Sequence, residues 1–312
     1  MTEFCRSLEI REDVNGKYDD DTSKSYLWVG SVHWSKENHE RALDSFCRAF
    51  RIRLTVTGSK EDCGVVTNWI SKVLEAKQVD KDAYWKQIMS AIEREGKGDK
   101  LSEEGKFDQA ILEYRAALQL EQRRRQTKST VVSRPLVDAA DLYVKIGRMY
   151  TALGRHDRAL FEFRNALAIY LAKFGRHQRY TQETYDDIYA AAKEKGWMDS
   201  VVDEYLESLY DSIVFEKNGD MLNEQRDYLG ASREYKQALK LEEGGMGKLH
   251  LPSAALYSKL AKIYAGQGNK DQALYNCCKA LGIYEAALGS HHGLTITTNK
   301  MIKALFLEEP QV

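Results

Sequence analysis

Small and bulky residues recur along the chain at the spacing of an α-helix. Five alanines, here called the anchor alanines, are each followed by an aromatic residue or Cys after four positions and by a second Ala after seven. Such offsets place side chains on one stripe of a helix. The anchors are Ala42, Ala110, Ala159, Ala231 and Ala273, and the residues four positions later are Phe46, Tyr114, Phe163, Tyr235 and Cys277.

A second stripe precedes each anchor. Twelve residues before it stands Gly or Ala, and five residues before it stands Gly in three of the five cases. We therefore expect helical hairpins, in which small residues let two helices approach and the aromatic rings fill the space between them. The later Gly supplies a left-handed helix stop. Glu37 and Arg226 take its place in the other two cases, so we expect those two turns to differ.

The pattern predicts an all-α protein. Three prolines in 312 residues also favour long helices. No single hairpin buries its apolar face, so neighbouring hairpins must stack. The expected helices cover about residues 24–35, 38–57, 62–77, 81–104, 107–126, 135–153, 156–174, 179–195, 200–225, 228–243, 252–266, 270–288 and 291–307, and residues 244–251 are expected to be a glycine-rich linker.

A longer period overlies the hairpins. At an offset of 121 residues, Gly98, Asp99 and Tyr114 recur as Gly219, Asp220 and Tyr235. The other type of hairpin recurs at offsets of 117 and 114 residues. The predicted organisation is a polar lead-in (1–23), a half unit (24–79), two full units (80–196 and 197–307) and a tail (308–312).

This order of small residue, aromatic, Gly turn, Ala, aromatic and Ala resembles the tetratricopeptide repeat (TPR), over roughly residues 26–305. Two longer hairpins, with Gly175 and His177 and with Gly289 and His291, partly resemble repeats of kinesin light chains and nephrocystin-like proteins. The resemblance implies a TPR-type α-α superhelix, a solenoid of helical hairpins whose concave groove is lined by the first helix of each hairpin.

Residues about 14–15 and 11 positions before the anchor tend to face the groove in TPR proteins. Here their charges alternate between acidic and basic, which fits either a partner-binding groove or ordinary surface charge that was copied by duplication. The positions carry no paired Asn, so capture of a C-terminal carboxylate, as in some TPR domains, is not expected. The candidate groove residues are Glu95, Asp99, Lys145, Arg148, Glu216, Asp220, Lys259 and Lys262.

Composition narrows the classes of function. Lys and Arg total 46 against 47 Asp and Glu, so the basic excess expected for binding nucleic acid or anionic membranes is missing. No run of 18 apolar residues predicts membrane insertion, and the acidic first 21 residues resemble no signal or transit peptide. Five cysteines form no disulfide framework. We therefore expect a cytoplasmic protein.

No motif predicts catalysis or a cofactor. The sequence contains no G-x-S-x-G, H-E-x-x-H, P-loop or G-x-G-x-x-G context. Cys277 and Cys278 would point about 100° apart on a helix and could not share a tetrahedral metal ion. His291 and His292 lack a third ligand, and His177 at an equivalent position favours a structural role. We expect no enzyme activity, no metal, no cofactor and no small-molecule substrate.

A basic cluster, Gln-Arg-Arg-Arg-Gln-Thr-Lys-Ser-Thr at residues 122–130, opens a predicted linker at Arg123–Arg134. Three interpretations fit it. The cations could complement the helix dipole, the arginines could direct a basophilic kinase to Thr127, or the segment could be a nuclear import signal. The sequence alone leaves the three open.

Trp28 and Trp34 lie on the first predicted helix. They could form a docking surface for a partner, or they could cap the end of the solenoid.

The predicted function is that of a non-catalytic scaffold or adaptor, which presents a concave TPR groove to a partner peptide or helix. One alternative is a structural subunit of a larger assembly, which contacts its partners by its convex face or its ends. A second alternative is an RNA-binding helical repeat, against which the net charge of -1 argues.

Overall fold

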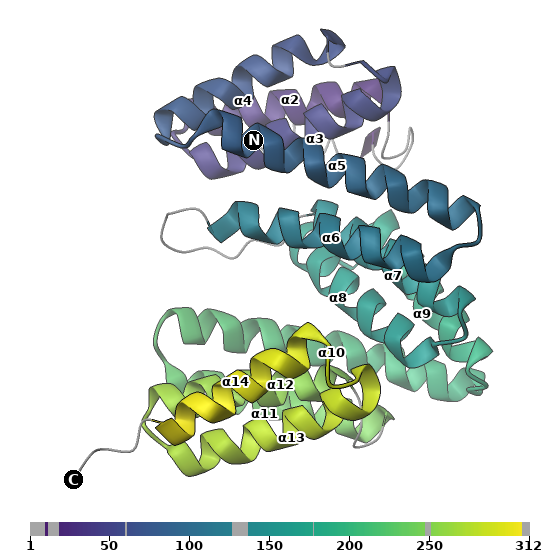
Figure 1. Ribbon diagram of the computed structural model, residues 1–312, viewed down its shortest axis with the longest axis vertical. Coiled ribbons are helices and arrows are strands. Elements are labelled where there is room, and N and C mark those ends of the chain that lie inside the picture. Colours follow the sequence, from purple (N-terminus) through teal and green to yellow (C-terminus); the bar gives the residue numbers. More distant parts are fainter. Residues whose placement is uncertain are drawn as a thin grey trace. The chain divides into compact units, whose positions relative to one another are not determined.

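The computed structural model describes residues 10–11, 19–59, 61–126, 137–176, 178–246 and 251–307. Every regular element in these ranges is a helix (Figure 1). The short 3-10 helix η1 (Glu61–Cys63) precedes α4. In chain order the α-helices are α2 (Asp20–Ser35), α3 (His39–Thr57), α4 (Gly64–Ala76), α5 (Lys81–Glu103), α6 (Phe107–Gln126), α7 (Val137–Ala152), α8 (His156–Phe174), α9 (Arg179–Glu194), α10 (Asp199–Glu224), α11 (Tyr228–Met246), α12 (Leu251–Gly266), α13 (Lys270–Leu288) and α14 (Gly293–Leu307).

The predicted all-α fold is confirmed, and most helix bounds lie within two residues of the prediction. Helix α2 begins earlier, because the Asp19 side chain accepts a hydrogen bond from the Asp21 N–H (2.9 Å) and caps its first turn. Helix α11 continues through Gly244 to Met246, where a linker was predicted. A helical glycine costs only about 1 kcal/mol, which the buried ion pair of Glu242 with Arg164 in the preceding turn can offset.

The predicted linker at Arg123–Arg134 is also corrected at its start. Helix α6 runs to Gln126, so residues 123–126 are helical. The remainder of that segment, with the candidate phosphorylation site Thr127, lies outside the described residues.

All five hairpin turns share one backbone conformation. The residue five positions before the anchor has φ of 72°, 67° and 74° at Gly105, Gly154 and Gly268, and φ of 56° and 63° at Glu37 and Arg226. In each turn the next N–H donates to the carbonyl five residues earlier, at 2.8–2.9 Å. The expectation that the Glu37 and Arg226 turns differ is wrong, because the closing bond and the packing of the two helices together offset a left-handed cost of roughly 1–2 kcal/mol.

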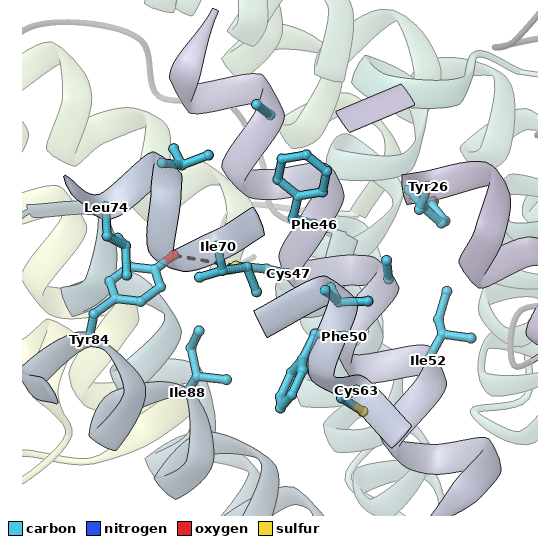
Figure 2. Close-up of a cluster of buried hydrophobic side chains, with 14 of the residues drawn as sticks. Tyr26, Phe46, Cys47, Phe50, Ile52, Cys63, Ile70, Leu74, Tyr84 and Ile88 are labelled. Carbon is cyan, nitrogen blue, oxygen red and sulfur yellow. Dashed lines mark hydrogen bonds between the residues drawn. The ribbon is translucent and has the colours of Figure 1, made fainter. Parts of the chain in front are cut away.

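Unit 1 of the two compact units comprises residues 1–149 and 169–184. Its main apolar core lies between α2, α3, α4 and α5, as Figure 2 shows. Phe46 and Phe50 of α3, Ile70 and Leu74 of α4 and Ile88 of α5 are each 4% exposed or less. The rings of Phe50 and Trp85 meet edge to face, with centroids 5.1 Å apart. The first helix of one hairpin therefore packs on the second helix of the hairpin before it.

Unit 2 comprises residues 150–168 and 185–312. Tyr235 of α11 packs with Leu256 and Leu260 of α12, and Cys277 of α13 packs with Leu305 of α14. Arg158 of α8 donates two hydrogen bonds to the Ala287 carbonyl at the end of α13, at 2.8 and 3.1 Å. The stacked hairpins are thus tied by polar contacts as well as apolar ones. No described helix is long and apolar enough to cross a membrane.

Candidate functional site

Three of the four predicted groove residues of unit 1 contact one another. Lys145 of α7 donates to the Glu95 carboxylate (2.8 Å) and to both oxygens of Asp99 (2.7 and 2.9 Å), and both acids lie on α5. Arg51 of α3 pairs with the same Glu95 and donates to Glu121 of α6 at 2.7 Å. The result is a chain of alternating charges that links four helices, here called the ladder of unit 1.

Unit 2 contains a second ladder of the same composition. Lys259 of α12 donates to Glu216 (2.8 Å) and to both oxygens of Asp220 (2.6 and 2.7 Å) on α10. Arg164 of α8 donates to the same Glu216 (2.8 Å) and to Glu242 of α11 (2.8 Å). The two ladders follow the 121-residue period, because Glu216, Asp220 and Glu242 correspond to Glu95, Asp99 and Glu121.

Sequence reasoning assigned the acids of α5 and α10 and both lysines to the groove, but it did not assign the two arginines or the acids Glu121 and Glu242. Counted from the anchor alanines, Arg164 corresponds to Cys47, and Arg51 corresponds to Ala168, one helical turn further on. Comparison at a fixed offset cannot show a cation that has moved by one turn. The repeated acids Glu121 and Glu242 were the available signal, because a buried carboxylate requires a cation or hydrogen-bond donors.

The inner and outer ends of each ladder differ in exposure. The Arg164 side chain is 3% exposed and Glu242 is 1% exposed, whereas Lys259 and Asp220 are 29% and 47% exposed. In unit 1 the equivalent Lys145 and Asp99 are 28% and 44% exposed. Each unit therefore seals its Arg–Glu end and presents a Lys–Asp pair to solvent.

An aromatic ring supports each exposed pair. The Tyr114 hydroxyl donates to Asp99 at 2.8 Å, and the Lys145 ammonium lies 5.5 Å from the centre of the same ring. Tyr235 makes the same two contacts with Asp220, at 2.7 Å, and with Lys259, at 5.4 Å. A ring so placed limits how far the lysine and the aspartate can move.

The ion pairs shift the ionisation of the buried acids. Burial raises the pKa of Glu216, but Arg164 and then Lys259 oppose it, and they lower the pKa to about 2 from an ordinary 4.5. Burial likewise raises the pKa of Glu95, but the charges of Arg51 and Lys145 oppose it and bring the pKa below its ordinary value. Both acids are therefore ionised at neutral pH.

Acid is expected to destabilise the protein through these groups. Because the folded pKa of Glu216 lies below its unfolded value, its contribution is fully present above about pH 4.5 and is lost as the pH falls towards 2. The loss is on the order of 3 kcal/mol. Urea unfolding measured from pH 7 to pH 3 checks this. A Glu216→Gln variant should show a flatter profile, and an identical profile would contradict the assignment.

The last two groove candidates, Arg148 on α7 and Lys262 on α12, are exposed.

The cysteine and histidine residues that the sequence analysis considered lie outside the ladders. Burial raises the pKa of the Cys277 thiol to about 11, with a smaller contribution from Cys278, so the thiol stays protonated. His291 is exposed, and His177 lies outside the described residues. Among the residues that the structure describes, no group of three His, Cys, Asp or Glu side chains could hold a metal ion.

The two tryptophans of α2 differ. Trp28 is 62% exposed. Trp34 packs into the hairpin, with its ring 4.9 Å from His39 and 6.3 Å from Trp69. Trp28 is therefore exposed, whereas Trp34 is half-buried against the core of unit 1.

Comparisons with known proteins identify the repeats. Two tetratricopeptide repeat models match, one over residues 253–293 and the other over 23–55 and 140–172. No curated protein sequence matches the chain. Among solved structures, BtubC (BKLC) from P. vanneervenii is 16% identical, with 86% of this chain and 83% of that chain covered and a TM-score of 0.26.

The apo form of the quorum sensor NprR from B. thuringiensis is 15% identical, with 96% of this chain and 81% of that chain covered and a TM-score of 0.34. Scores this low carry no argument about sites, so the assignment depends on the repeat models and on the five hairpins with one shared turn. On these grounds the chain is an all-α helical repeat protein that contains tetratricopeptide-like repeats.

Proposed function

We propose that the protein is a non-catalytic scaffold that holds a partner peptide or helix along the first helices of its hairpins. The partially exposed Lys–Asp pair at the outer end of each ladder carries this proposal. Lys145 with Asp99 and Lys259 with Asp220 offer a donor and an acceptor side by side, and an aromatic ring fixes both. Repeat proteins commonly bind their partners on the exposed face of successive repeats, and each unit offers one such pair.

The internal pairing determines the kind of recognition. A charged group of the partner must compete with the ion pair that Lys145 or Lys259 already forms with its aspartate. Such a group therefore adds little to the net binding affinity. Hydrogen bonds to the remaining lone pairs of Asp99 and Asp220 can still fix the register of a bound segment. Arg148 and Lys262 lie one helical turn beyond the ladder lysines and would add attraction for an acidic partner.

Charge reversal at these two exposed residues tests the proposal. Arg148→Glu and Lys262→Glu are expected to reduce the recovery of partners from cells at least tenfold, as measured by affinity capture and quantitative mass spectrometry. Lys240→Glu, on the exposed side of α11, is the matched control and should recover the same proteins as the unaltered chain. Unchanged recovery with both groove variants, at unchanged thermal stability, would refute the groove.

The alternative of a structural subunit that binds through its ends has one observation in its favour. Tyr275 of α13 is 54% exposed and Phe306 of α14 is 63% exposed, so these helices present apolar surface. An RNA-binding function has no comparable support, because the net charge is -1 and acids interrupt the groove. Cytoplasmic localisation stays a prediction from the sequence.

A further inference from the structure

Helices α3 and α4, α8 and α9, and α13 and α14 are three copies of one arrangement. The pairs recur along the chain at offsets of 117 and 114 residues. A long helix follows each of the first two pairs: α5 follows α4, and α10 follows α9. Within the described residues no helix comes after α14. A comparison of the three copies therefore shows what such a following helix covers.

In the first copy α5 covers one face of the pair. The Tyr84 hydroxyl lies 3.4 Å from the Cys47 sulfur of α3, and the two groups point toward each other in Figure 2. Ile88 belongs to the same apolar cluster as Leu74 of α4. Cys47 is 6% exposed and Leu74 is 0% exposed, so this face is sealed.

In the second copy α10 follows in the same way. Its residues Tyr205 and Leu209, which lie 121 residues after Tyr84 and Ile88, are 2% and 1% exposed. At the end of α9, Ala192 is 0% exposed. Ala192 occupies the place of Leu74, because the two carbonyls accept equivalent hydrogen bonds at the helix end. The Trp197 N–H donates to the Ala192 carbonyl at 3.1 Å, and the Val79 N–H donates to the Leu74 carbonyl at 3.0 Å. Lys193 of α9 pairs with Asp199 in the first turn of α10 at 2.8 Å.

In the third copy the same face is open. Phe306, 114 residues after Ala192, is 63% exposed. Cys278, in the place of Cys47, is exposed, and Leu281, in the place of Phe50, is half-buried where Phe50 is 1% exposed. We call Cys278, Leu281 and Phe306 the open face of α13 and α14.

We propose that the open face docks an amphipathic helix of a partner protein, in the way that α5 and α10 pack on the earlier copies. The chain itself specifies the chemistry of this helix. It carries an aromatic and an aliphatic residue four positions apart, as Tyr84 and Ile88 do, and an acid in its first turn, as Asp199 does. Lys303 stands 114 residues after Tyr189, which hydrogen-bonds to Asp199, and it would meet this acid.

A second copy of this chain fits the open face less well. Helix α14 contains two lysines, Lys300 and Lys303, both exposed, and no acid. Two copies of α14 would bring like charges together. The helices of a second copy that have the required stripe, α5 and α10, already use it within their own units. The occupant is therefore a partner helix of complementary charge.

Two segments of this chain serve as probes, namely synthetic peptides of residues 80–94 and 198–213. Either peptide, labelled with a fluorophore, is expected to bind the full chain, as measured by anisotropy. Phe306→Glu should weaken this binding at least tenfold. Leu112→Glu, which alters a side chain that is 68% exposed on α6, is the matched control and should have no effect.

A charge exchange makes the test specific. A 198–213 peptide with Asp199→Lys should bind the unaltered chain several-fold more weakly than the original peptide does, and Lys303→Glu should restore its binding. Three results would overturn the proposal. They are no binding of either peptide, binding that Phe306→Glu leaves unchanged, and a dimer of the chain that Phe306→Glu dissociates, which would assign the open face to a second copy.

Discussion

Replacement of Arg164 by methionine is expected to lower the free energy of unfolding by about 3–5 kcal/mol. The guanidinium is the cation that Glu216 and Glu242 share, and its side chain is 3% exposed. Methionine fills much of the same volume and supplies no charge. Both carboxylates then stay buried without the cation that neutralised them. The loss of an ion pair at a buried site lowers the free energy of unfolding more than the loss of an ion pair in water does. Urea unfolding followed by circular dichroism measures the change.

Two further variants separate charge from packing. The triple variant Arg164→Met, Glu216→Gln, Glu242→Gln should recover most of the lost stability, because it removes the charges that Arg164 neutralised. Arg233→Met, at an exposed position on α11, should change the unfolding free energy by less than about 0.5 kcal/mol. A loss below about 1 kcal/mol for Arg164→Met would show that the ladder contributes little to stability.

The sequence predicted the fold through its small residues. Alanines and glycines at fixed offsets mark where two helices touch, and the contact geometry leaves few other residues possible there. The hairpin turns were predicted less completely. Glu37 and Arg226 have positive φ where Gly was expected to be required, because the closing hydrogen bonds of the turn impose the conformation. Local preference indicates the usual residue, and the tertiary structure can override it.

The candidate site was predicted by position and not by interaction. Asp99 and Lys145 were assigned to the groove from their distance to the anchor alanines, and the structure places them in contact with each other. The pairing depends on how α5 and α7 lie side by side, which a single sequence does not specify. Arg51 and Arg164 were missed because they lie on second helices, at positions that differ by one turn. The groove function itself stays a proposal.

The ladders connect the stability of the fold with the proposed groove. The buried Arg–Glu end joins the second helix of one hairpin to both helices of the next, and Lys145 extends the connection to a third hairpin. A change at the buried end should therefore alter the spacing of the first helices. Stability variants such as Arg164→Met are expected to weaken partner binding even though the altered side chain is sealed from solvent.

Two glycines on α5 should respond in opposite directions to replacement by alanine. Gly96 has open space where a Cβ would lie, so Gly96→Ala should raise the unfolding free energy by about 0.5–1 kcal/mol through helix propensity. At Gly98 the Cβ would lie 2.5 Å from a ring carbon of Tyr114. Gly98→Ala should therefore lower the unfolding free energy by about 1–3 kcal/mol.

The ring cannot easily make room for this methyl group. Tyr114 is 2% exposed, its hydroxyl donates to Asp99 at 2.8 Å, and the Lys145 ammonium lies over its face. A smaller side chain should relieve the clash, so Gly98→Ala combined with Tyr114→Leu should be more stable than the sum of the two single changes by about 1 kcal/mol or more. Urea unfolding of the four variants measures this coupling. If both glycine replacements stabilised the protein, close approach of the two helices would not be the reason for glycine at residue 98.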